Sequence, residues 1–197
     1  MLPQVTLRDA SGRIVVARFR EASLEDVPAI ARLIALSARS LSREDYSEDQ
    51  IEAAIGTALG VDSQLIADGT YFVAEVDETL VACGGWSRRK TLFGSDAESG
   101  RHPALLDPTH DAARIRAFFV HPDWARRGLG RATLELCESE ARRSGFSSAE
   151  LMATLPGVRL YRSCGYASRA AIEHTLPGGM TIRFVPMRKD LGASLPE

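Results

Sequence analysis

The sequence predicts a single mixed α/β domain, and three observations support this fold class. The 197 residues fit the usual size of one domain. Hydrophobic residues make up 45% of the chain and charged residues 25%, which is ordinary for a globular protein with a sizeable core. Strand-like segments and helical periodicities follow one another in the order β-α-α-β-β-β-α-β-α-β-β. We expect an N-terminal extension over residues 1–13, one domain over 14–190 and a C-terminal tail over 191–197.

The first half of the chain supplies two helices and three strands. Residues 1–13 are polar, so we expect them to be loosely attached. Ser23 and Ser47 each precede an apolar stripe at helical spacing and are expected to begin helices. The β-branched and apolar runs predict strands, with Asp77 and Glu78 at a turn, over residues 14–20, 71–76 and 79–86.

The second half begins with residues 90–111, which are rich in glycine, proline and polar side chains. Such a long loop in a compact domain is often functional. The following periodicities alternate between strand and helix character. They predict strands over 115–120, 150–153, 170–175 and 181–185, and helices over about 128–144 and 158–163.

Charge and cysteine content exclude several classes of protein. The formal net charge is −2, whereas a nucleic-acid-binding domain usually carries a basic excess. The three cysteines are widely spaced and form no CxxC motif, so we expect free thiols and no metal site. The N-terminus does not resemble a signal peptide, and no apolar run approaches the roughly 20 residues of a membrane span. These features predict a cytoplasmic protein without membrane partners.

A basic glycine loop lies between the strand over 115–120 and the helix that follows it. Backbone N–H groups at a helix start are unpaired and bind anions, and glycine lets phosphate oxygens approach them. Positively charged side chains at this end of a helix are unfavourable unless an anion is bound there. The sequence of the loop is Arg126-Arg127-Gly128-Leu129-Gly130-Arg131. It predicts a site for an anion such as a phosphate group.

Other anion-binding patterns fit this loop less well. The P-loop pattern GxxxxGK[ST] is absent, and the dinucleotide pattern GxGxxG would need glycine where Thr133 stands. A helix start that uses its glycines only for tight packing remains an alternative, as does a different nucleotide-binding domain.

Two motifs resemble the GNAT superfamily, the GCN5-related N-acetyltransferases. The family pattern [Q/R]-x-x-G-x-[G/A] is matched at residues 125–130, although Ala125 stands where glutamine or arginine is usual. A Tyr-x-x-x-Gly-[Phe/Tyr] pattern is matched at residues 161–166. The resemblance implies a mixed sheet of about six to seven strands, splayed around an acyl-CoA site and flanked by about four helices.

The resemblance also implies the donor and its binding residues. It implies acetyl-CoA as co-substrate without a metal, and direct transfer to a primary amine of a small molecule or peptide. The pantetheine arm would lie along the strand edge, a bulge near Phe118 would direct an N–H group at the thioester, and the pyrophosphate would bind the glycine loop. The implied donor-binding residues are Phe118, Phe119, Val120, Arg126, Arg127, Gly128, Leu129, Gly130, Arg131 and Ala132.

Tyr161 matches the family tyrosine that protonates the departing thiolate. No general base is implied, because Arg114 stands where several members carry glutamate. The remaining alternatives are a water chain or a titratable side chain elsewhere. The candidate side chains are Glu75, Asp111, His121, Glu173 and His174.

The acceptor site is predicted only broadly. Arginines near strand ends are candidates for binding a substrate carboxylate or phosphate. The candidate acceptor-site residues are Tyr46, Trp86, Arg88, Arg114 and Arg116, with Phe93, Leu105 and Leu106 as further candidate walls. A non-catalytic acyl-CoA-binding or sensing domain is the alternative function. The resemblance also allows a homodimer.

Overall fold

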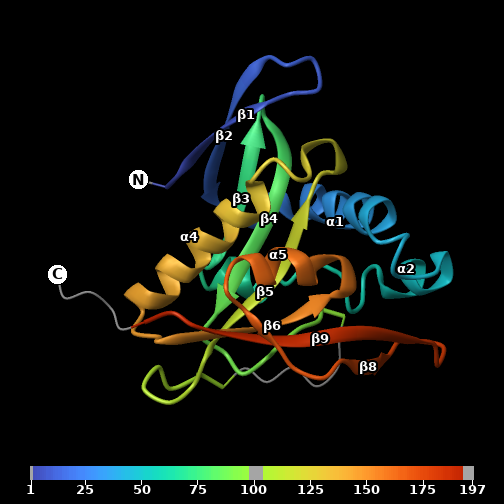
Figure 1. The fold of residues 1–197 in the computed structure, drawn as a ribbon, viewed down its shortest axis with the longest axis vertical. Helices are drawn as coiled ribbons and strands as arrows, with labels where there is room; N and C mark the ends of the chain where they lie inside the picture. Colours follow the sequence, from blue (N-terminus) through green and yellow to red (C-terminus); the bar gives the residue numbers. More distant parts are fainter. Residues whose placement is uncertain (1, 98–103, 193–197) are drawn as a thin grey trace.

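The computed structural model describes residues 2–97 and 104–192, and its centre is one twisted mixed sheet (Figure 1). The strands are β1 (Gln4–Arg8), β2 (Ile14–Glu21), β3 (Tyr71–Val76), β4 (Thr79–Ser87), β5 (Ala113–Val120), β6 (Ser148–Thr154), β7 (Ala167–Ser168), β8 (Ile172–Thr175) and β9 (Thr181–Asp190). The α-helices are α1 (Val27–Leu41), α2 (Glu48–Ala54), α3 (Ser63–Ala67), α4 (Leu129–Arg143) and α5 (Val158–Ser163).

The sheet splits between β5 and β6. Its strand order is β1-β2-β3-β4-β5-β6-β9-β7, and β8 pairs with β9. The β5–β6 pair is parallel and spans only Ala113–Ile115 against Ala149–Leu151, after which the two strands separate. Figure 1 shows β2, β3 and β4 running upright while β6 and β9 lie across them. The predicted mixed α/β fold with a splayed sheet is confirmed.

Each face of the sheet carries its own apolar core. α4 and α5 contribute to one core through residues such as Leu134 and Tyr161. α1, α2 and α3 contribute to the other through residues such as Ile30, Ile51 and Leu65. The two cores lie on opposite faces of the sheet. They meet at the gap that opens where β5 and β6 separate.

Local sequence signals account for several element boundaries. Ser47 accepts a hydrogen bond from the backbone of Gln50 and starts α2 with a capping box. Asp77 and Glu78 have φ values of 47° and 63°, which is the left-handed pair that a tight hairpin turn requires. Both the predicted helix start and the predicted hairpin are therefore confirmed.

Three of the strands and α-helices were not predicted from the sequence: β1, α3 and the two-residue strand β7. The expectation that residues 1–13 are loosely attached is wrong for β1, which pairs with β2 from Gln4 to Arg8. Its residues alternate between polar and apolar, with Leu7 buried and Val5 half-buried, but a run of five residues is a weak strand signal. The short helix α3 was also not predicted, since five residues carry too little periodicity. None of the helices in residues 2–97 and 104–192 combines the length and apolar character that a membrane crossing needs.

Candidate active site

β5 carries a bulge where the sheet splits. The pairing of β4 with β5 shifts here, so that Ala117 and Phe118 both lie opposite Gly84. Ala117 has a φ of 55°, which is left-handed and unfavourable for a residue with a side chain. The buried Tyr71 hydroxyl donates a hydrogen bond of 2.9 Å to the Ala117 carbonyl and holds this conformation. The predicted bulge near Phe118 is confirmed.

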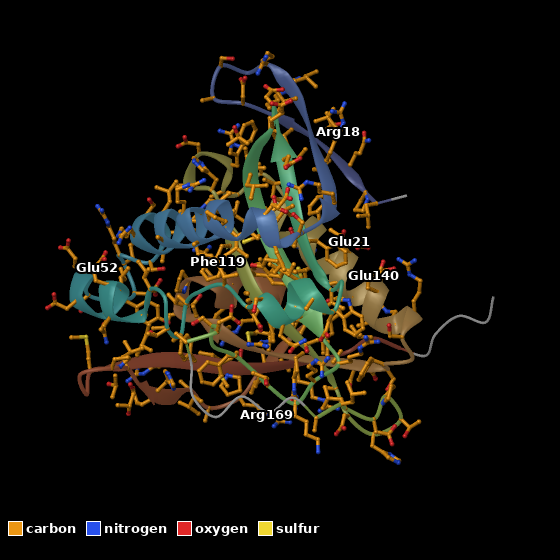
Figure 2. All side chains as sticks on the ribbon, turned by 180° about the vertical axis from the view of Figure 1, so that it is seen from behind. Arg18, Glu21, Glu52, Phe119, Glu140 and Arg169 are labelled. Atoms are coloured by element: carbon orange, nitrogen blue, oxygen red, sulfur yellow. The ribbon has the colours of Figure 1, made fainter. Side chains whose placement is uncertain are left out.

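The bulge redirects the side chains that follow it and leaves one strand edge open. Phe118 packs against the core under α4, whereas Phe119 packs against the core under α1. Phe119 lies near the middle of the view in Figure 2, seen from behind, and is half-buried. Residues 116–120 pair with β4 but not with β6, because the β5–β6 ladder ends at Ile115. This segment of β5 therefore presents backbone groups to the gap in the sheet.

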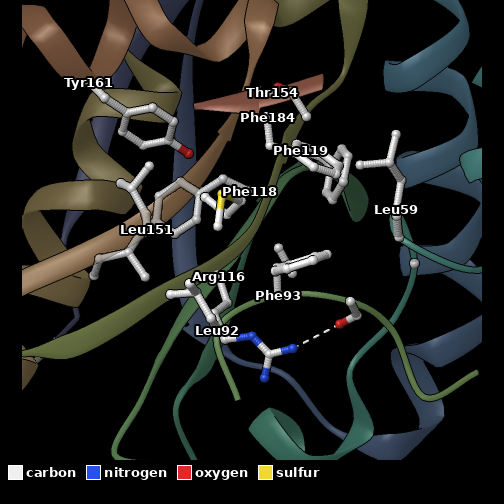
Figure 3. A pocket seen from close by; sticks show the side chains of 16 residues that line it. Leu59, Leu92, Phe93, Arg116, Phe118, Phe119, Leu151, Thr154, Tyr161 and Phe184 are labelled. Carbon is white, nitrogen blue, oxygen red and sulfur yellow. Dashed lines mark hydrogen bonds between the residues drawn. The ribbon is translucent and has the colours of Figure 1, made fainter. Parts of the chain in front are cut away.

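The gap holds a cavity of about 60 Å³ (Figure 3). Its wall draws on both cores, so the cavity passes through the sheet. We call one part of the wall the Tyr161 side; it consists of Ile115, Phe118, Leu151 and Tyr161. We call the opposite part the Phe93 side; it consists of Ala58, Leu59, Phe93, Phe119, Met152 and Phe184.

Tyr161 directs its hydroxyl toward this cavity from α5 (Figure 3). Its ring packs edge-on against Phe118, with the ring centres 6.4 Å apart. Gly157 makes room for it, because a Cβ there would lie 3.1 Å from the Tyr161 ring. Burial raises the pKa of Tyr161 well above its usual range, so the hydroxyl keeps its proton at neutral pH. The side chain is therefore a proton donor at the cavity.

The glycine loop lies at the start of α4, where the sequence predicts an anion site. Gly128 is the N-cap with a φ of 92°, and Arg126 is also left-handed with a φ of 60°. Such conformations turn successive N–H groups toward a common point. The first turn of α4 contains no acidic side chain, and a Cβ on Gly128 would meet nothing within 4 Å. The loop is thus open to an anion that approaches from outside the chain.

The three arginines of the loop have different surroundings. Arg126 and Arg131 are exposed, and Arg131 donates a hydrogen bond of 3.0 Å to the Ser163 hydroxyl. Arg127 stacks over the Trp124 ring at 5.5 Å and donates to the Arg8 carbonyl. The side chain of Arg127 therefore ties the cradle to β1.

Of the five predicted acceptor-site residues, Arg116 lines the cavity. Trp86 lies in the core against Phe146, and Arg88 is exposed beyond the end of β4. Arg114 forms an ion pair with Glu150 on β6. The Tyr46 hydroxyl donates to the Arg183 carbonyl at 2.6 Å and accepts from the Leu155 N–H at 2.8 Å, so it connects two backbone segments.

The five candidate bases do not line the cavity. Glu75 binds Arg20, and Glu173 binds Arg183 at the surface. Asp111 accepts a backbone hydrogen bond from Asp107, and His121 accepts one from Asp123. His174 comes nearest, because its ring lies 4.9 Å from that of Phe93 and 6.1 Å from that of Phe184.

Asp62 is a site residue that the sequence analysis missed. Its side chain is fully buried and forms an ion pair with Arg116, whose side chain is 3% exposed. Asp62 also caps α3 by accepting a hydrogen bond from the Gln64 N–H. An aspartate before a short polar helix is a recognisable cap, but nothing in the sequence links it to an arginine on β5.

An open strand edge, an anion cradle at a helix start and a buried tyrosine between them are features of an acyl-CoA-dependent acyltransferase. The chain belongs to the acetyltransferase (GNAT) family, whose model matches residues 32–166. No curated protein sequence matches the chain.

Several solved structures share the fold. A GCN5-related N-acetyltransferase from Rhodopseudomonas palustris is 21% identical with a TM-score of 0.65, and the match covers 94% of this chain and 98% of that one. A PaiA N-acetyltransferase from Thermoplasma acidophilum, in complex with coenzyme A, is 15% identical with a TM-score of 0.60 over 88% and 98% of the two chains. A putative acetyltransferase from Salmonella typhimurium, with acetyl-CoA, is 17% identical with a TM-score of 0.58 over 92% and 98%. The chain is an acetyltransferase of the GNAT type.

Proposed function

We propose that this acetyltransferase moves an acetyl group from acetyl-CoA directly to a primary amine, with Tyr161 as general acid. The observation that carries the proposal is the single cavity that brings together the β5 bulge, the open β5 edge and the Tyr161 hydroxyl. The free cysteines fit a reducing compartment, and we place the protein in the cytoplasm.

Different groups of the protein bind different parts of the donor. The N–H groups from Arg126 to Arg131 bind the pyrophosphate, and Arg126 and Arg131 add positive charge. The Ala132 N–H, which the resemblance also implied, already donates to the Gly128 carbonyl at 2.9 Å and takes no part. The edge formed by Phe119 and Val120 holds the pantetheine arm through backbone hydrogen bonds. The N–H group at Phe118, on the bulge, is directed at the thioester carbonyl and stabilises the charge that develops there.

The amine attacks from the opposite side of the cavity. Its nitrogen forms the new C–N bond, the C–S bond breaks, and Tyr161 protonates the departing thiolate. Burial keeps the Tyr161 hydroxyl protonated until the thiolate forms and makes the phenolate ready to be protonated again. The same raised pKa makes the hydroxyl a weaker acid, so the transfer depends on the charge that develops on the departing sulfur in the same apolar site. Burial also raises the pKa of the Cys83 thiol to about 12, which favours direct transfer over an acyl-cysteine route.

Two measurements test the proposal. The melting temperature should rise with coenzyme A or acetyl-CoA, by an amount that corresponds to about 2.7 kcal/mol at 100 times the dissociation constant. Thiol release from acetyl-CoA should then depend on an added amine and yield the amide. Stabilisation by a nucleotide but not by coenzyme A would overturn the donor. Binding without turnover on any amine would favour the sensing alternative.

A further inference from the structure

The Phe93 side of the cavity is almost entirely apolar. Aromatic and aliphatic side chains form it, and the neighbouring lining residues add Thr154 and Arg116 as polar side chains. Among the described lining residues there is no carboxylate and no histidine. This composition differs from a site built to bind a second ammonium group, which needs acidic partners.

The one cation of the wall is already neutralised. Arg116 pairs with Asp62, and both side chains are buried, at 3% and 0% exposed. Arg116 also donates a hydrogen bond of 2.8 Å to the Gly94 carbonyl, visible as the dashed line in Figure 3. The pair therefore ties β5 to the two segments that wall the Phe93 side, and it adds no net charge.

Among the described residues, titratable groups stand around the cavity on several elements, including Tyr71 on β3 and Cys83 on β4, which both contact the Ala117 carbonyl of the wall. Arg116 faces it from β5, and Tyr161 faces it from α5. Asp62 stands behind Arg116 on the α2–α3 connection, and His174 stands behind Phe93 on β8. With Arg116 and Asp62 compensating each other, an amine that enters the cavity meets, among the described lining residues, no uncompensated negative charge that would hold it as an ammonium ion.

We infer that the acceptor is a primary amine on an apolar carbon skeleton, without a carboxylate or a second ammonium group near the nitrogen. This inference rests on the proposed function. A carboxylate on the acceptor would be the second anion around Arg116, and a second ammonium group would lie beside it without a partner. Both arrangements bury an uncompensated charge, which is strongly unfavourable.

The same environment removes the need for a separate strong base. The apolar wall selects the neutral form of the amine, whose nitrogen attacks the thioester carbonyl carbon. As the C–N bond forms and the C–S bond breaks, the amine loses one proton and the sulfur gains one. Tyr161 gives its proton to the sulfur and recovers one from the nitrogen. The balance is complete with acetyl-CoA and the neutral amine alone.

Matched acceptor pairs test the inference on the full chain. Phenethylamine is compared with phenylalanine, and butylamine with 1,4-diaminobutane, by thiol release and by mass of the product. We expect kcat/KM to favour the member without the additional charge by roughly 100-fold or more, because a buried unpaired charge is so unfavourable. Equal use of both members, or preference for the charged one, overturns the inference. If none of the four is acetylated, the inference fails; if coenzyme A also leaves the melting temperature unchanged, the proposed donor fails with it.

The variant Asp62→Asn sharpens the test. Asparagine keeps the helix cap but removes the charge, so Arg116 becomes available to a substrate carboxylate. The phenylalanine-to-phenethylamine ratio of kcat/KM should rise at least about tenfold, as expected for a charge-assisted contact. Asp68→Asn, at the other end of α3, is the matched control and should leave the ratio unchanged. An unchanged ratio in a variant that still melts cooperatively and binds coenzyme A would assign Asp62 a purely structural role. If the variant does not fold, the wild-type pairs decide.

Discussion

The Tyr161 side and the Phe93 side of the cavity are built in different ways. Most of the proposed donor site that adjoins the Tyr161 side comes from one continuous stretch, in which β5 runs through its bulge into the glycine loop and α4. The contacts we propose there are made largely by backbone N–H groups and depend on φ values such as the 92° of Gly128. The Phe93 side gathers single side chains from segments far apart in the sequence, such as Leu59, Phe93 and Phe184.

This difference separates binding of the donor, which many sequences can achieve, from selection of the acceptor, which depends on particular side chains. A pyrophosphate and a pantetheine arm can be held by backbone geometry, which many sequences satisfy. An acceptor is selected by side chains, whose identity can change while the fold stays the same. We therefore expect changes on the two sides to affect different kinetic constants.

The largest effect is expected at Tyr161. Tyr161→Phe removes the proton donor and leaves the ring, so kcat should fall by about 10²–10⁴-fold, the usual range for a general acid. The melting shift with coenzyme A should remain. Tyr166→Phe is the control, because this buried ring lies 5.9 Å away and does not line the cavity. Unchanged turnover of Tyr161→Phe at every pH would remove the acid role.

Gly128→Val tests the cradle. A valine at a φ of 92° is strained and places methyl groups where phosphate oxygens approach the N–H groups. Binding of coenzyme A, measured by calorimetry, should weaken by about 10- to 100-fold, as expected for the loss of one or two charge-assisted hydrogen bonds. Gly178→Val is the matched control, since Gly178 has a φ of 86° and is equally open. Equal loss of affinity in both variants would mean that backbone strain, and not the cradle, is responsible.

The Tyr161 side and the adjoining stretch from β5 to α4 could be predicted from the sequence. The order of elements, the hairpin at Asp77 and the loop around Gly128 each follow from residues adjacent in the chain, because caps, turns and glycine conformations are local. The bulge was expected near Phe118 through the family resemblance, and not from the residues themselves.

The Phe93 side, built from distant segments, could be predicted only in part: Arg116 and Phe93 were expected there and line the cavity, but the partner of Arg116 was not expected. Asp62 and Arg116 are far apart in the sequence, and each alone resembles an ordinary polar residue. Tyr46 and Trp86 were plausible pocket residues by type, but their partners are the backbone of Arg183 and the ring of Phe146. Contacts of this kind depend on how β5, β6 and β9 are placed by the whole fold.

Tyr71→Phe tests whether the hydrogen bond from the Tyr71 hydroxyl maintains the conformation of the bulge. The variant removes the 2.9 Å hydrogen bond to the Ala117 carbonyl and should lower the free energy of unfolding by about 1–3 kcal/mol. Turnover should also fall, by up to about tenfold, since small displacements of an aligned group reduce the rate steeply. Tyr46→Phe loses hydrogen bonds away from the bulge, so it should lower stability without changing the KM for acetyl-CoA. A Tyr71→Phe protein with normal kinetics would show that the bulge holds itself.

The smallest effect is expected from a change in pH, which alters the stability of the segments behind the Phe93 side. Asp68 at the end of α3 binds Arg89, which follows β4, through contacts of 2.6 and 2.7 Å. These hydrogen bonds lower the pKa of Asp68 below its ordinary value of 3.8. The folded state thus holds the proton more weakly than the unfolded state. The resulting stability is fully present above pH 3.8 and is lost as the pH falls through the folded-state pKa.

Asp68→Asn should therefore lower the free energy of unfolding by about 1 kcal/mol at pH 7, and the difference from the wild type should shrink below pH 4. Urea unfolding at several pH values measures it. Glu52→Gln removes an ion pair of the same kind with Arg39, but both side chains are nearly half exposed, so its effect should be smaller at every pH. If instead the Asp68 difference persisted unchanged into acid, the contribution of the Arg89 contact would come from packing and not from charge.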